Sequence, residues 1–88
     1  MKRVQLFDIS PLIQVTAIKD TSELKGLDCI KLITYGYTTE GDYLEFQFCL
    51  EYENEQIRDE EFDDLTNEHV KKSIEAIVKE SQIPMHLI

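Results

Sequence analysis

The fold is decided by the stretch YLEFQFCLEY, residues 43–52. Apolar and polar side chains alternate along these ten residues with a period of two, which is typical of a β-strand that buries one face. One side of the strand is therefore predicted to enter the core. That side carries Leu44, Phe46, Phe48, Leu50 and Tyr52.

This strand is expected to pair with the segment before it. Residues 28–37 are rich in β-branched and aromatic side chains, and TTEGD at residues 38–42 has turn chemistry, with Gly41 able to adopt a positive φ. A loop of this length places Tyr37 opposite Tyr43, and in that register the apolar faces of the two strands coincide. We therefore predict an antiparallel hairpin of residues 28–37 and 43–53 at the centre of the sheet.

The other face of the hairpin is predicted to be polar and aromatic. In the same register Cys49 lies opposite Lys31 rather than Cys29, so we expect two free thiols. The side chains on this face are Tyr35, Tyr37, Tyr43, Glu45, Gln47, Cys49 and Glu51.

The remaining segments predict the other elements of the fold. Residues 4–9 and 12–18 look extended and are separated by Pro11, which cannot donate a hydrogen bond to a strand ladder. Towards the C-terminus, apolar residues recur at helical spacing after Thr66, a good N-cap, and residues 59–65 leave room for an earlier helical turn. The recurring apolar residues are Val70, Ile74, Ile77 and Val78.

These elements predict the α+β class. We expect residues 1–88 to form a single domain, with an antiparallel sheet of three or four strands and an amphipathic helix of about residues 66–82. The helix is expected to cover the apolar face of the central hairpin. The N-terminal sequence lacks an export signal, and no apolar run approaches the ~20 residues of a membrane helix, so we expect a cytoplasmic protein.

The charge is strongly negative and concentrated in one region. The formal net charge is −9, whereas residues 40–64 alone hold eleven acids and one base, Arg58. Phosphates would repel such a surface, so direct binding to nucleic acid or to an anionic membrane is disfavoured and a basic protein partner is favoured.

The sequence gives little support to catalysis or to metal binding. His69 and His86 are the two histidines, and neither belongs to a recognisable nucleophile or metal motif. The acids of residues 59–64 lack the glycine that a calcium loop of the EF-hand type requires. We expect no enzyme activity, no catalytic residue, no bound metal and no cofactor.

Two interpretations of the acidic region remain open. Acids at a helix start interact favourably with the macrodipole, and charged strand edges prevent aggregation, so the region can be a solvated surface. If the strand instead continues past Tyr52, then Glu51, Glu53 and Glu55 extend a row from Glu45 at intervals of about 6.6 Å. Such a row resembles the regular charges of a phosphate backbone, and tyrosines beside it suit arginine-rich targets.

The leading hypothesis is a small acidic inhibitor or regulator. It would occlude a basic surface on a nucleic-acid-binding protein or a nuclease, in the manner of a nucleic-acid mimic. Its size and charge are typical of phage-encoded inhibitors of host nucleases and defence systems, and of bacterial immunity proteins and antitoxins. The predicted partner-binding residues are Tyr35, Tyr37, Tyr43, Glu45, Glu51, Glu53, Glu55, Asp59, Glu60, Glu61, Asp63 and Asp64.

The alternative hypothesis is a housekeeping or structural module without catalytic activity. It would act as a homodimer formed through a strand edge or through the apolar tail at residues 85–88. The sequence leaves the choice between monomer and homodimer open.

Overall fold

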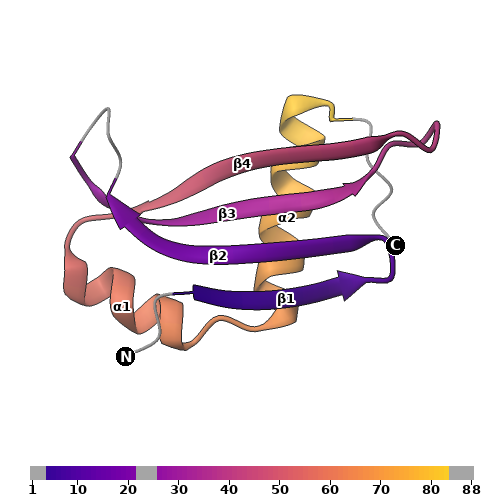
Figure 1. Ribbon diagram of the computed structural model, residues 1–88. Helices are drawn as coiled ribbons and strands as arrows, with labels where there is room; N and C mark the ends of the chain where they lie inside the picture. Colours follow the sequence, from indigo (N-terminus) through magenta and orange to yellow (C-terminus); the bar gives the residue numbers. More distant parts are fainter. Residues whose placement is uncertain (1–3, 22–25, 84–88) are drawn as a thin grey trace.

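A computed structural model describes residues 4–21 and 26–83 of the chain. Within these residues, four strands form one antiparallel sheet in chain order, and two helices follow the last strand (Figure 1). The elements are β1 (Val4–Ser10), β2 (Ile13–Thr21), β3 (Asp28–Tyr37), β4 (Tyr43–Tyr52), α1 (Glu55–Asp63) and α2 (Asn67–Ser81).

Both helices lie on the same face of the sheet, which we call the inner face. Figure 1 shows α2 crossing behind the strands from β1 towards β4, while α1 lies near the end of the sheet where β4 finishes. The opposite, outer face has no helix over it in the described part of the chain. The molecule is therefore a two-layer α+β structure, and the predicted fold class is confirmed.

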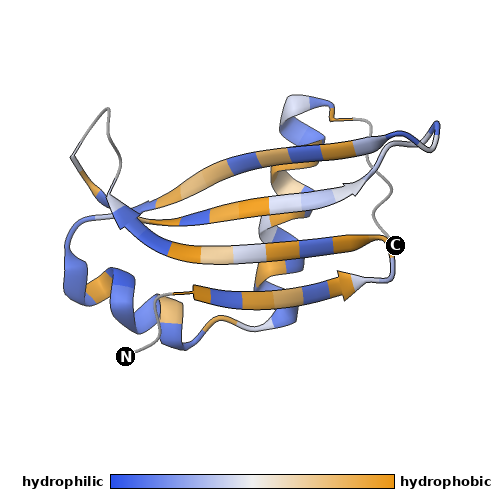
Figure 2. Ribbon diagram, viewed as in Figure 1, coloured by the Kyte–Doolittle hydropathy of each residue, from blue (hydrophilic) through white to orange (hydrophobic). Residues whose placement is uncertain are grey.

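The predicted register of the hairpin is confirmed. Tyr37 pairs with Tyr43, and Lys31 pairs with Cys49. The turn between the strands is closed by a backbone hydrogen bond of 2.7 Å from Thr38 to Asp42, and Gly41 has a φ of 92°, as turn chemistry requires. Figure 2 shows the resulting alternation of hydrophobic and hydrophilic residues along β4.

The position of the hairpin in the sheet differs from the prediction. The N-terminal segments pair with each other as β1 and β2, and β2 then pairs with β3, so β3 is an inner strand and β4 is an edge strand. The hairpin is thus not central, and β4 ends at Tyr52 rather than at residue 53. The alternating pattern identified the buried face of β4 but carried no information about its neighbours.

The core lies between the inner face and the two helices. Phe62 of α1 is fully buried, and α2 contributes three further buried side chains. The inner face of β4 packs against this core but stays partly exposed, because β4 has no strand beyond it. The buried apolar residues of the cluster are Phe7, Ile13, Val15, Ala17, Ile30, Leu32, Phe62, Val70, Ile74 and Val78.

The two helices differ in how well the sequence predicted them. For α2 the prediction is confirmed, since the side chain of Thr66 accepts a hydrogen bond of 3.2 Å from the backbone of His69. For α1 the sequence indicated room for one helical turn at residues 59–65, and the structure has a longer helix that already starts at Glu55. A full helix begins after Asn54, whose side chain accepts a 2.9 Å hydrogen bond from the backbone of Ile57. Neither helix in the described residues is long and apolar enough to cross a membrane.

Burial ranks the phenylalanines by their contribution to stability. Phe62→Ala should lower the free energy of unfolding by about 3–5 kcal/mol, the usual cost of emptying a fully buried aromatic site. Phe48→Ala should cost only about 1–2 kcal/mol, because its ring lies on the edge strand and is partly in water already. Urea unfolding of both variants tests this order, and equal losses would mean that the inner face of β4 is covered as fully as Phe62.

Candidate functional site

The predicted row of carboxylates is interrupted. The outer face of β4 carries Glu45 and Glu51, as the register predicted. Because β4 ends at Tyr52, Glu53 lies in a bend and Glu55 is the first residue of α1. The prediction that Glu51, Glu53 and Glu55 continue one regular row is therefore wrong, and the resemblance to evenly spaced phosphates no longer has a structural basis.

One part of the acidic region is used to fix α1 against the sheet. The side chain of Arg58 is only 10% exposed. Its Nη1 donates a 3.0 Å hydrogen bond to the carbonyl oxygen of Asp20. The same nitrogen lies 3.5 Å from Asp28 Oδ1, and Nε lies 3.1 Å from Asp59 Oδ1. Glu55 approaches Nη2 at 3.7 Å. These oxygens satisfy a guanidinium that would otherwise be costly to bury.

Lys19 provides a second buried cation beside the first. Its Nζ lies 3.3 Å from Asp59 Oδ1 and 5.0 Å from the centre of the Phe62 ring, which is cation–π distance. Asp59 thus bridges Lys19 of β2 and Arg58 of α1. Asp59 is thus a predicted partner-binding acid whose carboxylate serves to attach α1 to the sheet.

The ion pairs set the pKa of Asp59. Desolvation alone would raise the pKa of this carboxyl, but hydrogen bonds from Arg58 and Lys19, together with their charges, hold the pKa below its ordinary value of 3.8. Nearby, burial and the charge of Glu61 raise the pKa of Tyr52. The influence of Glu61 on Tyr52 shows that α1 adds negative charge near the end of β4.

The other acids of α1 are exposed and poorly placed for helix stability. Glu60, Glu61 and Asp63 lie in the C-terminal half of the helix, whereas only Glu55 lies in its first turn, and no basic residue lies in its last turn. Carboxylates near a helix C-terminus oppose the macrodipole, by about 0.3–1 kcal/mol each. The expectation that residues 59–64 begin a helix is therefore wrong, and the stabilising explanation fails for these three acids.

The acid closest to α2 lies in a different electrostatic environment. Asp64 is the C-cap of α1 and precedes Thr66, the N-cap of α2, by two residues. At that distance the N-terminal dipole of α2 offsets part of the unfavourable interaction with α1. Asp64 is exposed, as are Glu60, Glu61 and Asp63 of α1.

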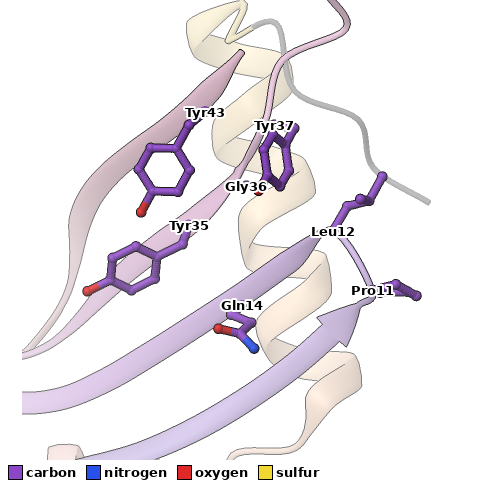
Figure 3. A pocket seen from close by; sticks show the side chains of 7 residues that line it. All are labelled: Pro11, Leu12, Gln14, Tyr35, Gly36, Tyr37 and Tyr43. Atoms are coloured by element: carbon purple, nitrogen blue, oxygen red, sulfur yellow. The ribbon is translucent and has the colours of Figure 1, made fainter. Parts of the chain in front are cut away.

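A second surface is formed by the tyrosines on the outer face. Tyr35, Tyr37 and Tyr43 line a hollow of about 250 Å³ beside the turn between β1 and β2 (Figure 3). Tyr43 lies at the start of β4 and Glu51 near its end, which places them about 26 Å apart at the usual rise of a strand. The predicted site residues therefore form two groups at opposite ends of the sheet, connected by β4.

Some residues of these surfaces could not be identified from the sequence. Leu12 and Gln14 complete the tyrosine hollow with Pro11, because β2 pairs with β3 in a register that the sequence did not reveal. Lys19 and Asp28 bind α1 from positions far away in the chain. The sequence contains one indication that Lys19 is buried. It occupies the next inward-facing position after Ile13, Val15 and Ala17, where an apolar residue would be expected.

The thiols occupy different environments on the outer face. Cys29 is fully buried, whereas Cys49 is exposed, and both are free. Burial, a hydrogen bond with Cys49 and the negative charges of Cys49 and Asp20 raise the pKa of Cys29 to about 11. Cys29 is therefore poorly suited to act as a nucleophile.

No cluster suited to a metal ion is found in residues 4–21 and 26–83, where groups of three or more His, Cys, Asp or Glu do not converge. His69 is exposed at the start of α2, and His86 lies outside the described residues. Comparison of the chain with protein-family models, with curated proteins and with solved structures found no match. The acids of α1 and the tyrosine hollow are therefore the two surfaces from which a function can be inferred.

The ion pairs of Asp59 predict a pH-dependent contribution to stability. A carboxyl group with a lower pKa in the folded state stabilises the protein above its unfolded pKa, here 3.8, and this contribution disappears as the pH falls through the folded pKa. Asp59→Asn should therefore be less stable than the wild type at pH 7, and the difference should shrink below about pH 4. Urea unfolding between pH 7 and pH 2 measures this.

Asp63→Asn is the matched control, because Asp63 is exposed and makes no ion pair with a described residue. It should leave the free energy of unfolding at pH 7 unchanged or slightly higher. An Asp59→Asn variant as stable as this control at pH 7 would show that the network does not anchor α1.

The two cysteines should differ in reactivity. At pH 8 in the native state, iodoacetamide should modify Cys49 and leave Cys29 intact, since only an exposed thiolate reacts readily. Mass spectrometry after proteolysis identifies the modified residue, and unfolding in urea should make both cysteines reactive. Equal native reactivity would contradict the burial of Cys29.

Proposed function

We propose that this protein is a small acidic binding module that occupies and blocks a basic surface on another protein. The observation that carries the proposal is the placement of Glu60, Glu61 and Asp63. These carboxylates are exposed, have no cationic partner among the described residues, and lie where the α1 dipole disfavours them. A charge pattern that lowers stability is more readily explained by binding than by folding.

Other acids of the same chain have cationic partners, and this difference supports the proposed binding role of Glu60, Glu61 and Asp63. Glu68 of α2 has a lysine partner one turn away, with Lys72 Nζ at 3.5 Å, and Asp59 is held between two cations. The chain thus pairs charges where they serve the fold. Glu60, Glu61 and Asp63 of α1 receive no such pairing from the described residues, and together they form a negative surface suited to lysine or arginine side chains.

The class of partner remains a nucleic-acid-binding protein or a nuclease, since these proteins present extended basic surfaces. An inhibitor of this kind would act by occlusion and needs no catalytic group, metal or cofactor. We place it in the reducing cytoplasm, where both thiols stay free.

A second candidate function is a homodimer formed through the outer face. The exposed aliphatic side chains of β1 favour it, because Val4 is 48% and Leu6 is 78% exposed. The two candidates differ in their response to salt. Added salt screens the repulsion between acidic copies and favours the homodimer, whereas it weakens the attachment of a basic partner. Sedimentation velocity at several protein and salt concentrations separates them.

The proposed function is tested by neutralising the exposed acids of α1. A triple variant with Glu60→Gln, Glu61→Gln and Asp63→Asn keeps the shape of the helix and removes three negative charges. Its stability should stay the same or rise, because the unfavourable interaction with the dipole is gone. Its binding to a basic partner should weaken, mainly through a slower association rate, and depend less on salt.

The partner is sought by immobilising the wild type, passing cell lysate over it, and eluting with heparin. The matched control is Glu68→Gln, Glu75→Gln and Glu80→Gln, which removes the same charge from α2, where Glu68 has a lysine partner. Proteins retained by the wild type and the control but lost by the α1 variant support the proposal. Equal retention by both variants would show that α1 is only a solvated surface.

A further inference from the structure

The hollow on the outer face lies at the end of the sheet away from α1. Its walls come from three strands and from the turn between β1 and β2 (Figure 3). At about 250 Å³ it is smaller than the roughly 300–1,000 Å³ of small-molecule sites, so it suits a single side chain rather than a cofactor. The lining residues are Pro11, Leu12, Gln14, Tyr35, Gly36, Tyr37 and Tyr43.

The aromatic rings of the hollow are arranged to contact a planar group. Tyr37 and Tyr43 lie directly opposite each other on β3 and β4, with ring centres 6.0 Å apart and planes inclined by 77°. They are 42% and 59% exposed, respectively, so parts of both rings are available to a partner. Figure 3 shows Tyr35 next to them, with the Gln14 amide on the neighbouring strand.

The charges around the hollow are negative. One cross-strand row on the outer face runs from Asp8 through Gln14 and Tyr35 to Glu45. The hollow thus lies beside a row with a carboxylate at each end. Glu45 lies two residues from Tyr43 on the same face of β4, and burial, the charge of Glu45 and the neighbouring tyrosines raise the pKa of Tyr43.

No cation of the described strands neutralises this end of the outer face. Lys31 is the one lysine or arginine that residues 4–21 and 28–52 place on that face, and it lies four residues before Tyr35, the partner of Glu45, towards the α1 end of the sheet. Its Nζ is already 3.0 Å from Asp20 Oδ2. The hollow therefore offers aromatic faces and an amide oxygen, and the carboxylates of Asp8 and Glu45 are the cross-strand neighbours of its lining residues Gln14 and Tyr35.

We propose that this hollow binds one arginine side chain of the partner protein, with its guanidinium against the tyrosine rings and its charge balanced by Glu45 and Asp8. Arginine suits the geometry better than lysine, because its planar and weakly hydrated group stacks on aromatic rings and donates several hydrogen bonds at once. This assignment rests on the proposed function and deepens it, since it names the residue type that the partner contributes.

The two surfaces then have separate tasks. The acids of α1 act over a distance and increase the rate of association, whereas the hollow makes a short-range contact that discriminates between basic side chains. A partner that presents an exposed arginine and a separate basic patch would engage both, because the hollow lies at the start of β4 and α1 follows the end of that strand.

The test uses the tripeptide acetyl-Gly-Arg-Gly-amide as the probe of the hollow. Two-dimensional NMR spectra of the whole protein are recorded at rising peptide concentrations up to about 10 mM, since one side chain in an open hollow supports only weak affinity. Shifts should be confined to Tyr35, Tyr37, Tyr43 and their neighbours. The lysine tripeptide should bind more weakly, and the uncharged citrulline tripeptide should produce no saturable shift.

Variants assign the contact to particular residues. Tyr43→Leu should weaken the arginine tripeptide about two- to fivefold, the range expected for an exposed cation–π contact, and Glu45→Gln should also weaken it. Glu51→Gln is the matched control, because it removes the same charge from the same face of β4 at the far end. Tyr43 lies on the surface, so the variant is expected to fold, and its NMR spectrum verifies that.

The outcomes distinguish this inference from the proposed function. If the arginine tripeptide causes no localised shift, or binds no better than the citrulline tripeptide, the inference is wrong even where the α1 variant still loses its partner. Equal loss in Glu45→Gln and Glu51→Gln would mean a diffuse charge effect and would also overturn it. Localised binding that depends on Tyr43 supports the inference even if the acids of α1 prove inert.

Discussion

The register between β3 and β4 is the constraint on which the rest of the structure depends. Shifting it by one residue would move Phe46 and Phe48 to the outer face and bring Glu45 and Gln47 into the core. A slip by any odd number of residues would exchange the two faces in this way and leave the helices a polar face to cover. Once this register is fixed, the two faces of the sheet differ in composition, since the inner face holds the core and the outer face carries the tyrosines together with carboxylates such as Asp8, Glu45 and Glu51.

A second constraint holds α1 in place. A helix with so many acids and only one fully buried aromatic ring has little apolar surface with which to attach to a sheet. Arg58 and Lys19 supply the missing attachment by meeting Asp59 and the strand ends of β2 and β3. Gln5 adds a 2.8 Å hydrogen bond from its side chain to the carbonyl oxygen of Phe62. Polar contacts therefore attach α1 to the sheet, whereas apolar packing attaches α2.

The difference between these two attachments explains what the sequence could and could not predict. Strand β4 and helix α2 carry periodic apolar patterns, so their type and buried faces followed from the sequence. In α1 the buried positions are Arg58 and Phe62, one helical turn apart, and the first of them is charged. A search for apolar periodicity cannot detect that stripe, because its partners Asp20, Asp28 and Lys19 become apparent only once the sheet is assembled.

The candidate site, like the fold, could be predicted from the sequence only in part. The tyrosines and Glu45 lie on one face because the period of a strand is two, and this was accessible from the register alone. The hollow beside them was not, because it needs Gln14 and Leu12 from strands whose pairing is set by the packing of the core. The predicted straight row of carboxylates through Glu53 and Glu55 does not form, because β4 ends at Tyr52 and Asn54 caps the following helix.

The arrangement of charge along β4 also bears on how a partner can approach. As an edge strand, β4 exposes backbone groups that could pair with a foreign strand, but Glu45 and Glu51 border it and discourage such addition. The basic partner that we propose would be attracted by these same carboxylates, so that charge would discourage strand pairing while favouring contact between side chains. The approach left open is across the outer face and along α1, where the described chain leaves tyrosine rings and carboxylates in contact with solvent.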